Sequence, residues 1–310
     1  MKRSPKLYFM LERLRRDMAE WWKRIFYRAE RHTTSNRMCP SCRALIGRED
    51  SNCPMCGVGL RIVAPRSASP GMLGGVLPMS LTATSALATI NIGLYALTLY
   101  ISFRTAQLEM TGTPGFGGIR IDTLVDFGAK WGPGILRNGE WWRLITAVFL
   151  HGNLMHIGFN MWVLLDMGPQ VEELFQTPKF LVMYLVAGVN GFLLSLFWNP
   201  GGVSVGASGA ILGLVGILIG ASFHHGHMGA AYRAPLVRWF IYILIFGLFL
   251  RVDNAAHIGG VATGALFGYL IPEGKPKTLS EEKLWNFLAI ISVLIMAASF
   301  AFMALEYAKG

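Results

Sequence analysis

The sequence predicts an all-α polytopic membrane protein, and three observations lead to that fold class. Of the 310 residues, 53% are hydrophobic and only 15% are charged, whereas soluble domains carry about 25% charged residues. The mean hydropathy is +0.44. Seven segments are apolar over roughly the length of a membrane-spanning helix, about 20 residues. They are residues 79–103, 144–166, 180–198, 205–223, 234–250, 254–272 and 285–305.

The charge distribution predicts the orientation of these spans. The first 78 residues carry 15 Lys or Arg against 6 Asp or Glu, and basic residues prefer the cytoplasmic side. The N-terminus is therefore expected to be cytoplasmic. The first outer loop, 104–143, holds five basic residues against this rule, and its four acidic residues nearly balance them. No cleavable signal peptide is expected, because the first long apolar run starts only near residue 79.

Composition divides the chain into five predicted segments. These are a basic amphipathic helix (1–35), a zinc-ribbon-like module (36–63), a Pro/Gly/Ser-rich linker (64–78), a six-span core (79–273), and a loop with a seventh transmembrane helix (274–310). The first segment has an apolar stripe at steps of three and four, with basic residues beside it. It is expected either to lie on anionic lipid or to pack on protein. Nucleic acid is not an expected partner.

All four cysteines fall in one short window. Cys39 and Cys42 form one Cys-x-x-Cys pair, and Cys53 and Cys56 form a second pair ten residues later. Two such pairs present four thiolates tetrahedrally, which is the usual structural zinc site. Iron in the same cage is the main alternative, and two disulfides are disfavoured in a cytoplasmic segment. The predicted zinc is structural, and no cofactor is expected for catalysis.

Ser208 lies at a break in the apolar pattern. Asn199-Pro200-Gly201-Gly202 ends the third span, and helix restarts near Ser208 within Gly206-Ala207-Ser208-Gly209. From Ser208 to Ser222 is too short a helix to cross a bilayer. Ser208 is therefore expected below the membrane surface, at a helix N-terminus whose free amides favour a developing oxyanion. A lone serine in a span more often bonds back to its own helix.

His257 opens the sixth predicted span, and glycine spacing indicates which helix it faces. Gly260, Gly264 and Gly268 follow His257 on one helix face. The fourth span repeats that spacing with its own glycines, Gly209, Gly213, Gly216 and Gly220. Faces of small residues let two helices approach backbone to backbone. If these faces meet, His257 becomes the base that a serine nucleophile needs.

Two further polar residues of the spans share one face. His156 and Asn160 are one helical turn apart on the second span, and both could donate hydrogen bonds into the outer cavity. An oxyanion hole completed by the Ser208 N–H is one interpretation, and hydrogen bonding between helices is the other. Asp253 is expected at the surface, so a Ser-His dyad is predicted rather than a triad. Glu172, beyond the inner end of the second span, is expected in solvent.

Several of these motifs, taken in order, resemble the rhomboid family of intramembrane serine proteases over residues 80–272. They are Gly139-Glu140-Trp141-Trp142-Arg143, His151, His156-x-x-x-Asn160, Gly206-Ala207-Ser208-Gly209 and Ala256-His257-x-x-Gly260-x-x-x-Gly264. The resemblance implies a six-helix core that cleaves transmembrane segments of other proteins. A location in the bacterial cytoplasmic (inner) membrane is expected.

The resemblance also implies a role for each matching residue. Ser208 would be the nucleophile and His257 the general base and acid, while His156 and Asn160 would form the oxyanion hole. Trp142 and Arg143 would be the structural pair of the outer first loop. The chain departs from the family at Leu212, where many bacterial members carry a tyrosine that supports the histidine, and in having a seventh span. A non-proteolytic binder of membrane helices is the alternative function, and a transporter with a broken helix is a third.

Overall fold

A computed structural model describes residues 37–38, 41, 45–46, 52–53, 55–59, 82–108, 117–250 and 252–308. The predicted amphipathic helix (1–35), the linker (64–78), Cys39 and Cys42 lie outside the described residues. The chain forms two compact units, residues 1–69 and 70–310.

The described part of the first unit consists of short antiparallel pairings. Strand β1 (Arg37–Met38) pairs with β2 (Leu45–Ile46), and Asn52 forms an isolated bridge with Gly59. Each pairing encloses one Cys-x-x-Cys sequence. Between Asn52 and Gly59 the chain makes a tight turn, in which Cys53 is buried and its N–H donates to Val58 O at 2.9 Å.

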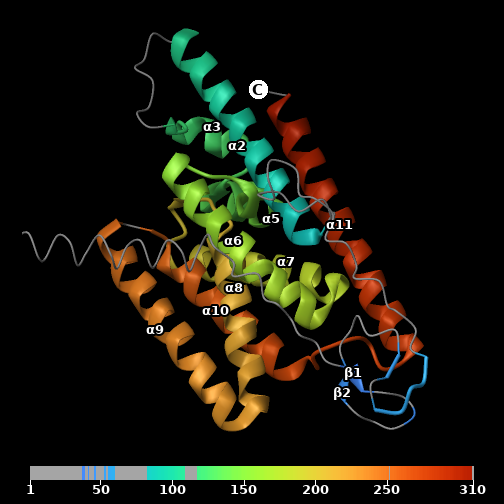
Figure 1. The fold of residues 1–310 in the computed structure, drawn as a ribbon. Helices are drawn as coiled ribbons and strands as arrows, with labels where there is room; N and C mark the ends of the chain where they lie inside the picture. The colour runs from blue at the N-terminus through green and yellow to red at the C-terminus, as the bar shows by residue number, and fades with distance from the viewer. Residues whose placement is uncertain are drawn as a thin grey trace, which may run out of the picture. The chain divides into compact units, whose positions relative to one another are not determined.

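The second unit is helical (Figure 1). Its helices are α2 (Ala83–Leu108), α3 (Ile121–Asp126), α4 (Gly132–Asn138), α5 (Arg143–Thr146), η2 (Ala147–Phe149), α6 (Leu154–Phe175), α7 (Thr177–Trp198), α8 (Ser208–Ala221), η3 (Ser222–His225), α9 (Gly226–Leu250), α10 (Asn254–Leu270) and α11 (Leu279–Tyr307). Two short strands, β3 (Lys130–Trp131) and β4 (Val203–Ser204), pair antiparallel. In Figure 1, α9 and α11 flank opposite sides of the group that contains α7, α8 and α10.

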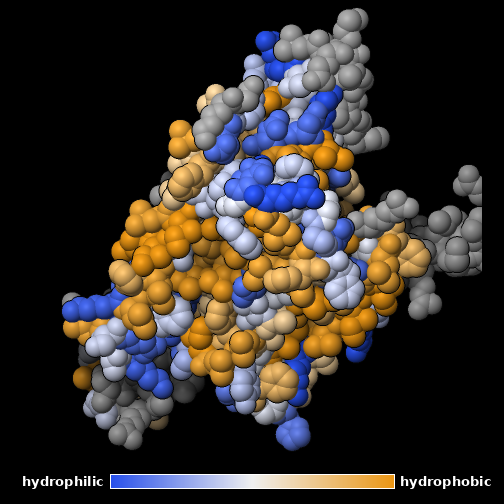
Figure 2. Space-filling model, turned by 180° about the vertical axis from the view of Figure 1, so that it is seen from behind, coloured by the Kyte–Doolittle hydropathy of each residue, from blue (hydrophilic) through white to orange (hydrophobic). Residues whose placement is uncertain are grey.

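Length and composition make this unit a multi-pass integral membrane protein. Four helical stretches among the described residues are long and apolar enough to span a bilayer, and the bent pair Arg143–Phe149 plus Leu154–Phe175 adds a fifth. The four are Ala83–Thr105, Thr177–Trp198, Ser208–Leu250 and Leu279–Tyr307. Figure 2 shows a broad apolar surface over the helices, as lipid contact requires. The predicted helical class is confirmed, and the count of seven spans stays a prediction.

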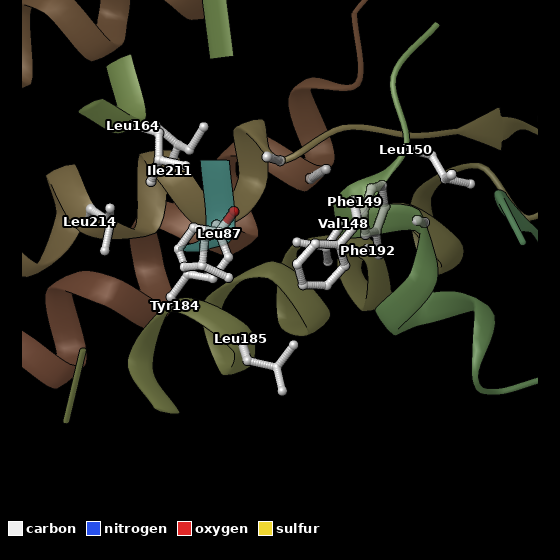
Figure 3. Close-up of a cluster of buried hydrophobic side chains, with 14 of the residues drawn as sticks. Leu87, Val148, Phe149, Leu150, Leu164, Tyr184, Leu185, Phe192, Ile211 and Leu214 are labelled. Carbon is white, nitrogen blue, oxygen red and sulfur yellow. The ribbon is translucent and has the colours of Figure 1, made fainter. Parts of the chain in front are cut away.

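The second predicted span, 144–166, is not one straight helix. Residues 144–149 form α5 and η2, which meet α6 at an angle of 88°. Helix α6 starts at Leu154, where the Asn153 side chain caps it by accepting the His156 N–H at 2.9 Å. His156 therefore lies in the first turn of this helix rather than near its middle. Leu144, Ala147, Val148 and Phe149 are instead buried in the core, where Figure 3 shows Val148 and Phe149.

Helices α8 and α10 pack backbone to backbone, as the glycine spacing predicted. A Cβ added at Gly260 would lie 2.0 Å from Gly209 O, and one added at Gly264 would lie 1.9 Å from Gly213 O. From the other side, a Cβ at Gly220 would lie 2.1 Å from Ala265 O. Side chains larger than hydrogen do not fit at these positions. The two helices are consequently held in one fixed register.

The expectation that Glu172 lies in solvent is wrong. Its carboxylate is buried and accepts hydrogen bonds from Ala83 N, Thr84 N and Thr84 Oγ1 at 2.7–3.0 Å, and from Thr177 Oγ1 at 2.8 Å. The first two are free amides at the N-terminus of α2, which a negative charge stabilises. Glu172 therefore joins the ends of α2, α6 and α7.

Candidate active site

Ser208 is the first residue of α8, and the preceding loop positions it. Gly206 adopts φ +133°, a backbone conformation that favours glycine. A Cβ at Gly206 would also lie 2.6 Å from His156 Nε2 and 3.7 Å from Ser208 Oγ. This glycine therefore allows the loop to turn into the helix while the His156 ring lies directly against it.

The structure brings Ser208 and His257 into contact. His257 Nε2 lies 2.9 Å from Ser208 Oγ, a hydrogen-bond distance. The His257 side chain is 5% exposed, and it lies in the first turn of α10, as Ser208 does in α8. A hydroxyl that donates to an imidazole can pass its proton to that ring as the oxygen attacks a carbonyl carbon.

Lys130 anchors the loop that carries Ser208, a role that no local sequence pattern predicts. Its side chain is 1% exposed, and Nζ donates to Asn199 O at 2.8 Å and to Gly202 O at 3.2 Å. Burial lowers the pKa of the Lys130 ammonium, and the nearby charge of Asp253 opposes that shift. The pairing of β3 with β4 holds the same loop. A further hydrogen bond, from Gly206 N to Ala147 O at 2.9 Å, holds the end of this loop next to Ser208.

His156 and Asn160 lie on α6 one turn apart. The His156 Nε2 atom faces Gly206, as described above, and its ring centre is 5.1 Å from that of the fully buried His151. Asn160 is 7% exposed, and its Nδ2 donates to no acceptor among the described residues. A buried amide donor without an acceptor costs free energy, and such a donor is available to bond a ligand or a reacting atom.

Trp142 and Arg143 stabilise the segment between α3 and α6. The Arg143 guanidinium is buried, forms an ion pair with Glu140, and donates to the carbonyls of Val125 and Ala129. It also lies over the Trp142 ring, 4.6 Å from the centroid. Because Ala129 precedes β3 directly, this pair supports the strand that holds the serine loop.

Comparison with known proteins gives the family. The model of the Rhomboid domain matches residues 138–273. This segment holds Ser208, His257, His156, Asn160, Trp142 and Arg143, whereas Lys130 precedes it. "Rhomboid protease GluP" of Bacillus subtilis (strain 168) is 34% identical over 201 residues, which are 64% of this chain and 38% of that protein. "RHOMBOID-like protein 1" of Arabidopsis thaliana is 31% identical over 244 residues, 68% of this chain and 62% of that protein. "Rhomboid-like protease 2" of Toxoplasma gondii is 32% identical over 192 residues, which are 58% of this chain and 66% of that protein.

These matches and the helical fold agree on one class, a multi-pass integral membrane protein. The chain belongs to the rhomboid family. It spans between about two fifths and two thirds of the length of these three relatives.

Proposed function

We propose that this protein is an intramembrane serine endopeptidase that cleaves transmembrane segments of other membrane proteins. The observation that carries the proposal is the 2.9 Å separation between Ser208 Oγ and His257 Nε2. The family supports it, because two of the similar proteins are named as proteases.

In the proposed reaction, Ser208 Oγ attacks the carbonyl carbon of the scissile peptide bond while His257 Nε2 takes the hydroxyl proton. The carbonyl π electrons move to oxygen, which becomes an oxyanion. When the oxyanion collapses, the C–N bond breaks and His257 returns the proton to the leaving amine. Water then attacks the acyl-serine by the same route, and this releases the acid and regenerates Ser208.

We assign the oxyanion hole to the Ser208 N–H, His156 and Asn160. Ser208 begins α8, so its amide has no acceptor within the helix, and the helix dipole favours negative charge there. Asn160 Nδ2 is a second buried donor that bonds no described acceptor. His156 Nε2 lies beside Gly206, two residues before the serine. Preorganised donors of this kind are commonly a large part of transition-state stabilisation.

A fluorophosphonate probe distinguishes this function from that of a non-proteolytic binder of membrane helices. The wild-type protein is expected to become covalently labelled at Ser208 and to cleave a reporter transmembrane substrate. The Ser208→Ala variant should do neither, and its thermal unfolding should match that of the wild type. A wild-type protein that is neither labelled nor active would favour the binder, and labelling of Ser208→Ala would place the nucleophile elsewhere.

The proposed orientation places the N-terminus in the cytoplasm and the site in the outer half of the membrane. The excess of basic residues in the first 78 positions supports this orientation. We also propose that the protein lies in the bacterial inner membrane and that residues 1–35 contact anionic lipids.

We also propose a structural zinc ion held by Cys39, Cys42, Cys53 and Cys56. The turn around Cys53 fits such a site, because Gly57 N donates to Cys53 O at 2.8 Å and Gly57 takes a left-handed φ of +71°. Metal analysis of the purified protein should find about one zinc per chain, since four thiolates bind one ion, and Cys53→Ser should remove it. Finding iron in place of zinc would contradict the assignment. So would a zinc content in Cys53→Ser equal to that of the wild type.

A further inference from the structure

His257 must be held in place without the aromatic support that the family often provides. The residue one turn after Ser208 is Leu212, a buried aliphatic side chain. The Nδ1 atom of His257 is buried and bonds to no acceptor or donor among the described residues. No hydrogen bond among the described residues therefore holds the ring at Nδ1, so its position depends on packing and on the backbone turn that carries it.

Asp253 fixes that turn from its N-terminal end. It is the N-cap residue of α10, and its Oδ1 accepts the Ala256 N–H at 3.1 Å. Its carbonyl oxygen accepts the His257 N–H at 3.2 Å. One residue thus binds the amide of the histidine and the amide directly before it. An N-cap of this kind satisfies donors that have no partner within the helix.

Helix α7 fixes Asp253 in turn. The second carboxylate oxygen, Oδ2, accepts a hydrogen bond from Ser195 Oγ, and Ser195 is 1% exposed in the last turn of α7. One turn earlier, Gly191 lies so close that an added Cβ would be 2.6 Å from Ala256 O. The first turn of α10 is therefore tied to α7 both by a side-chain hydrogen bond and by close backbone contact.

We propose that Asp253 is a positioning residue for His257. By capping α10 and accepting the Ser195 hydroxyl, it holds His257 Nε2 at hydrogen-bond distance from Ser208 Oγ. The effect of Asp253 on kcat rests on the proposed protease function. Its effect on the structure of the first turn of α10 rests on the geometry alone. Among the described residues, Asp253 forms no hydrogen bond with Ser208 or with the His257 side chain, so we assign its effect to the helix turn that it caps.

Kinetics of four variants test the proposal. Asp253→Ala removes the cap and should lower kcat for a reporter substrate roughly ten- to a hundredfold, because small displacements of a catalytic group cost that much. KM should stay unchanged, since Asp253 positions the base rather than the substrate. Asp253→Asn should keep kcat within about threefold of the wild type, because asparagine caps helices as well as aspartate does. Ser195→Ala should fall between the two.

Thr278 provides the matched control. It is the N-cap of α11 and accepts the Glu281 N–H at 3.1 Å, so Thr278→Ala removes a cap of the same type from a helix that carries no residue of the dyad. It should lower thermal stability but leave kcat per folded molecule unchanged. A wild-type kcat in Asp253→Ala would overturn the proposal. So would an Asp253→Asn variant as impaired as Asp253→Ala, since the charge rather than the cap would then matter.

Hydrogen exchange separates this proposal from the protease function. The amides of Ala256 and His257 should exchange faster in Asp253→Ala than in Asp253→Asn or the wild type, whether or not the protein cleaves anything. If the wild type is neither labelled by the probe nor active, the protease function fails, and this exchange difference still tests the positioning role. Equal exchange in all three proteins would overturn it.

Discussion

Replacing both Ser208 and His257 by alanine should cost no more activity than replacing either one, with each variant losing about 10⁴-fold or more in kcat. The hydroxyl is a weak nucleophile unless a base removes its proton, and the base has no function without the hydroxyl. The 2.9 Å contact between Oγ and Nε2 makes the two side chains one functional unit. Initial rates of reporter cleavage by the two single variants and the double variant form the measurement.

A histidine remote from the dyad is the control for this comparison of the single and double variants. His224 lies in η3 and bonds the Tyr269 carbonyl oxygen at 2.8 Å, so His224→Ala should keep wild-type kcat. Additive losses in the double variant would mean that the two side chains act independently. A His257→Ala variant within about tenfold of the wild type would move the base elsewhere, since losing a true base costs far more.

The sequence predicted the central helix pair and its contact because the relevant signal is local. Glycines at steps of three and four define a face on each helix without knowledge of the other. Such a face has few uses besides close approach. Once two faces of this kind exist, their common register follows, and it brings the first residues of α8 and α10 together. The distances at Gly260 and Gly264 confirm that reasoning.

The start of the second span could not be predicted from hydropathy. Most of residues 144–149 are apolar and buried in the core, and hydropathy reports burial rather than the direction of a helix. The break between His151 and Asn153 did carry a local signal, since asparagine is a preferred helix N-cap. The apolar run on its N-terminal side obscured that signal.

Polar residues that bind distant backbone were also beyond prediction. The acceptors of Lys130 lie 69 and 72 residues further along the chain, and the donors to Glu172 include amides 88 and 89 residues earlier. A single sequence contains no sign of such partners. A charged residue near a span end is usually solvated, so the sequence indicated solvent for Glu172. Asp253 was expected at the surface for the same reason, although it caps the helix that carries the base.

The close approach of α8 and α10 makes Gly264 the position where a side chain should do most damage to the fold. A Cβ there would lie 1.9 Å from Gly213 O, 2.7 Å from its carbonyl carbon and 2.9 Å from its Cα. All three are backbone atoms, which cannot rotate away as a side chain can. Gly264→Val should therefore force the helices apart and destabilise the fold by about 3 kcal/mol or more, the upper range of overpacking. Separation at Gly264 also moves His257 from Ser208, so probe labelling should be lost.

Gly93 is the matched control for this prediction, because it lies within the apolar helix α2 and an added Cβ would meet no described atom within 4 Å beyond its chain neighbours and its own helix backbone. Gly93→Val should change stability by less than about 1 kcal/mol, the scale of helix propensity, and labelling should be unaffected. Thermal unfolding and probe labelling of both variants in the same detergent give the comparison. Wild-type stability in Gly264→Val would contradict the backbone contact itself. Reduced stability with normal labelling would show instead that the dyad does not depend on how closely the two helices pack.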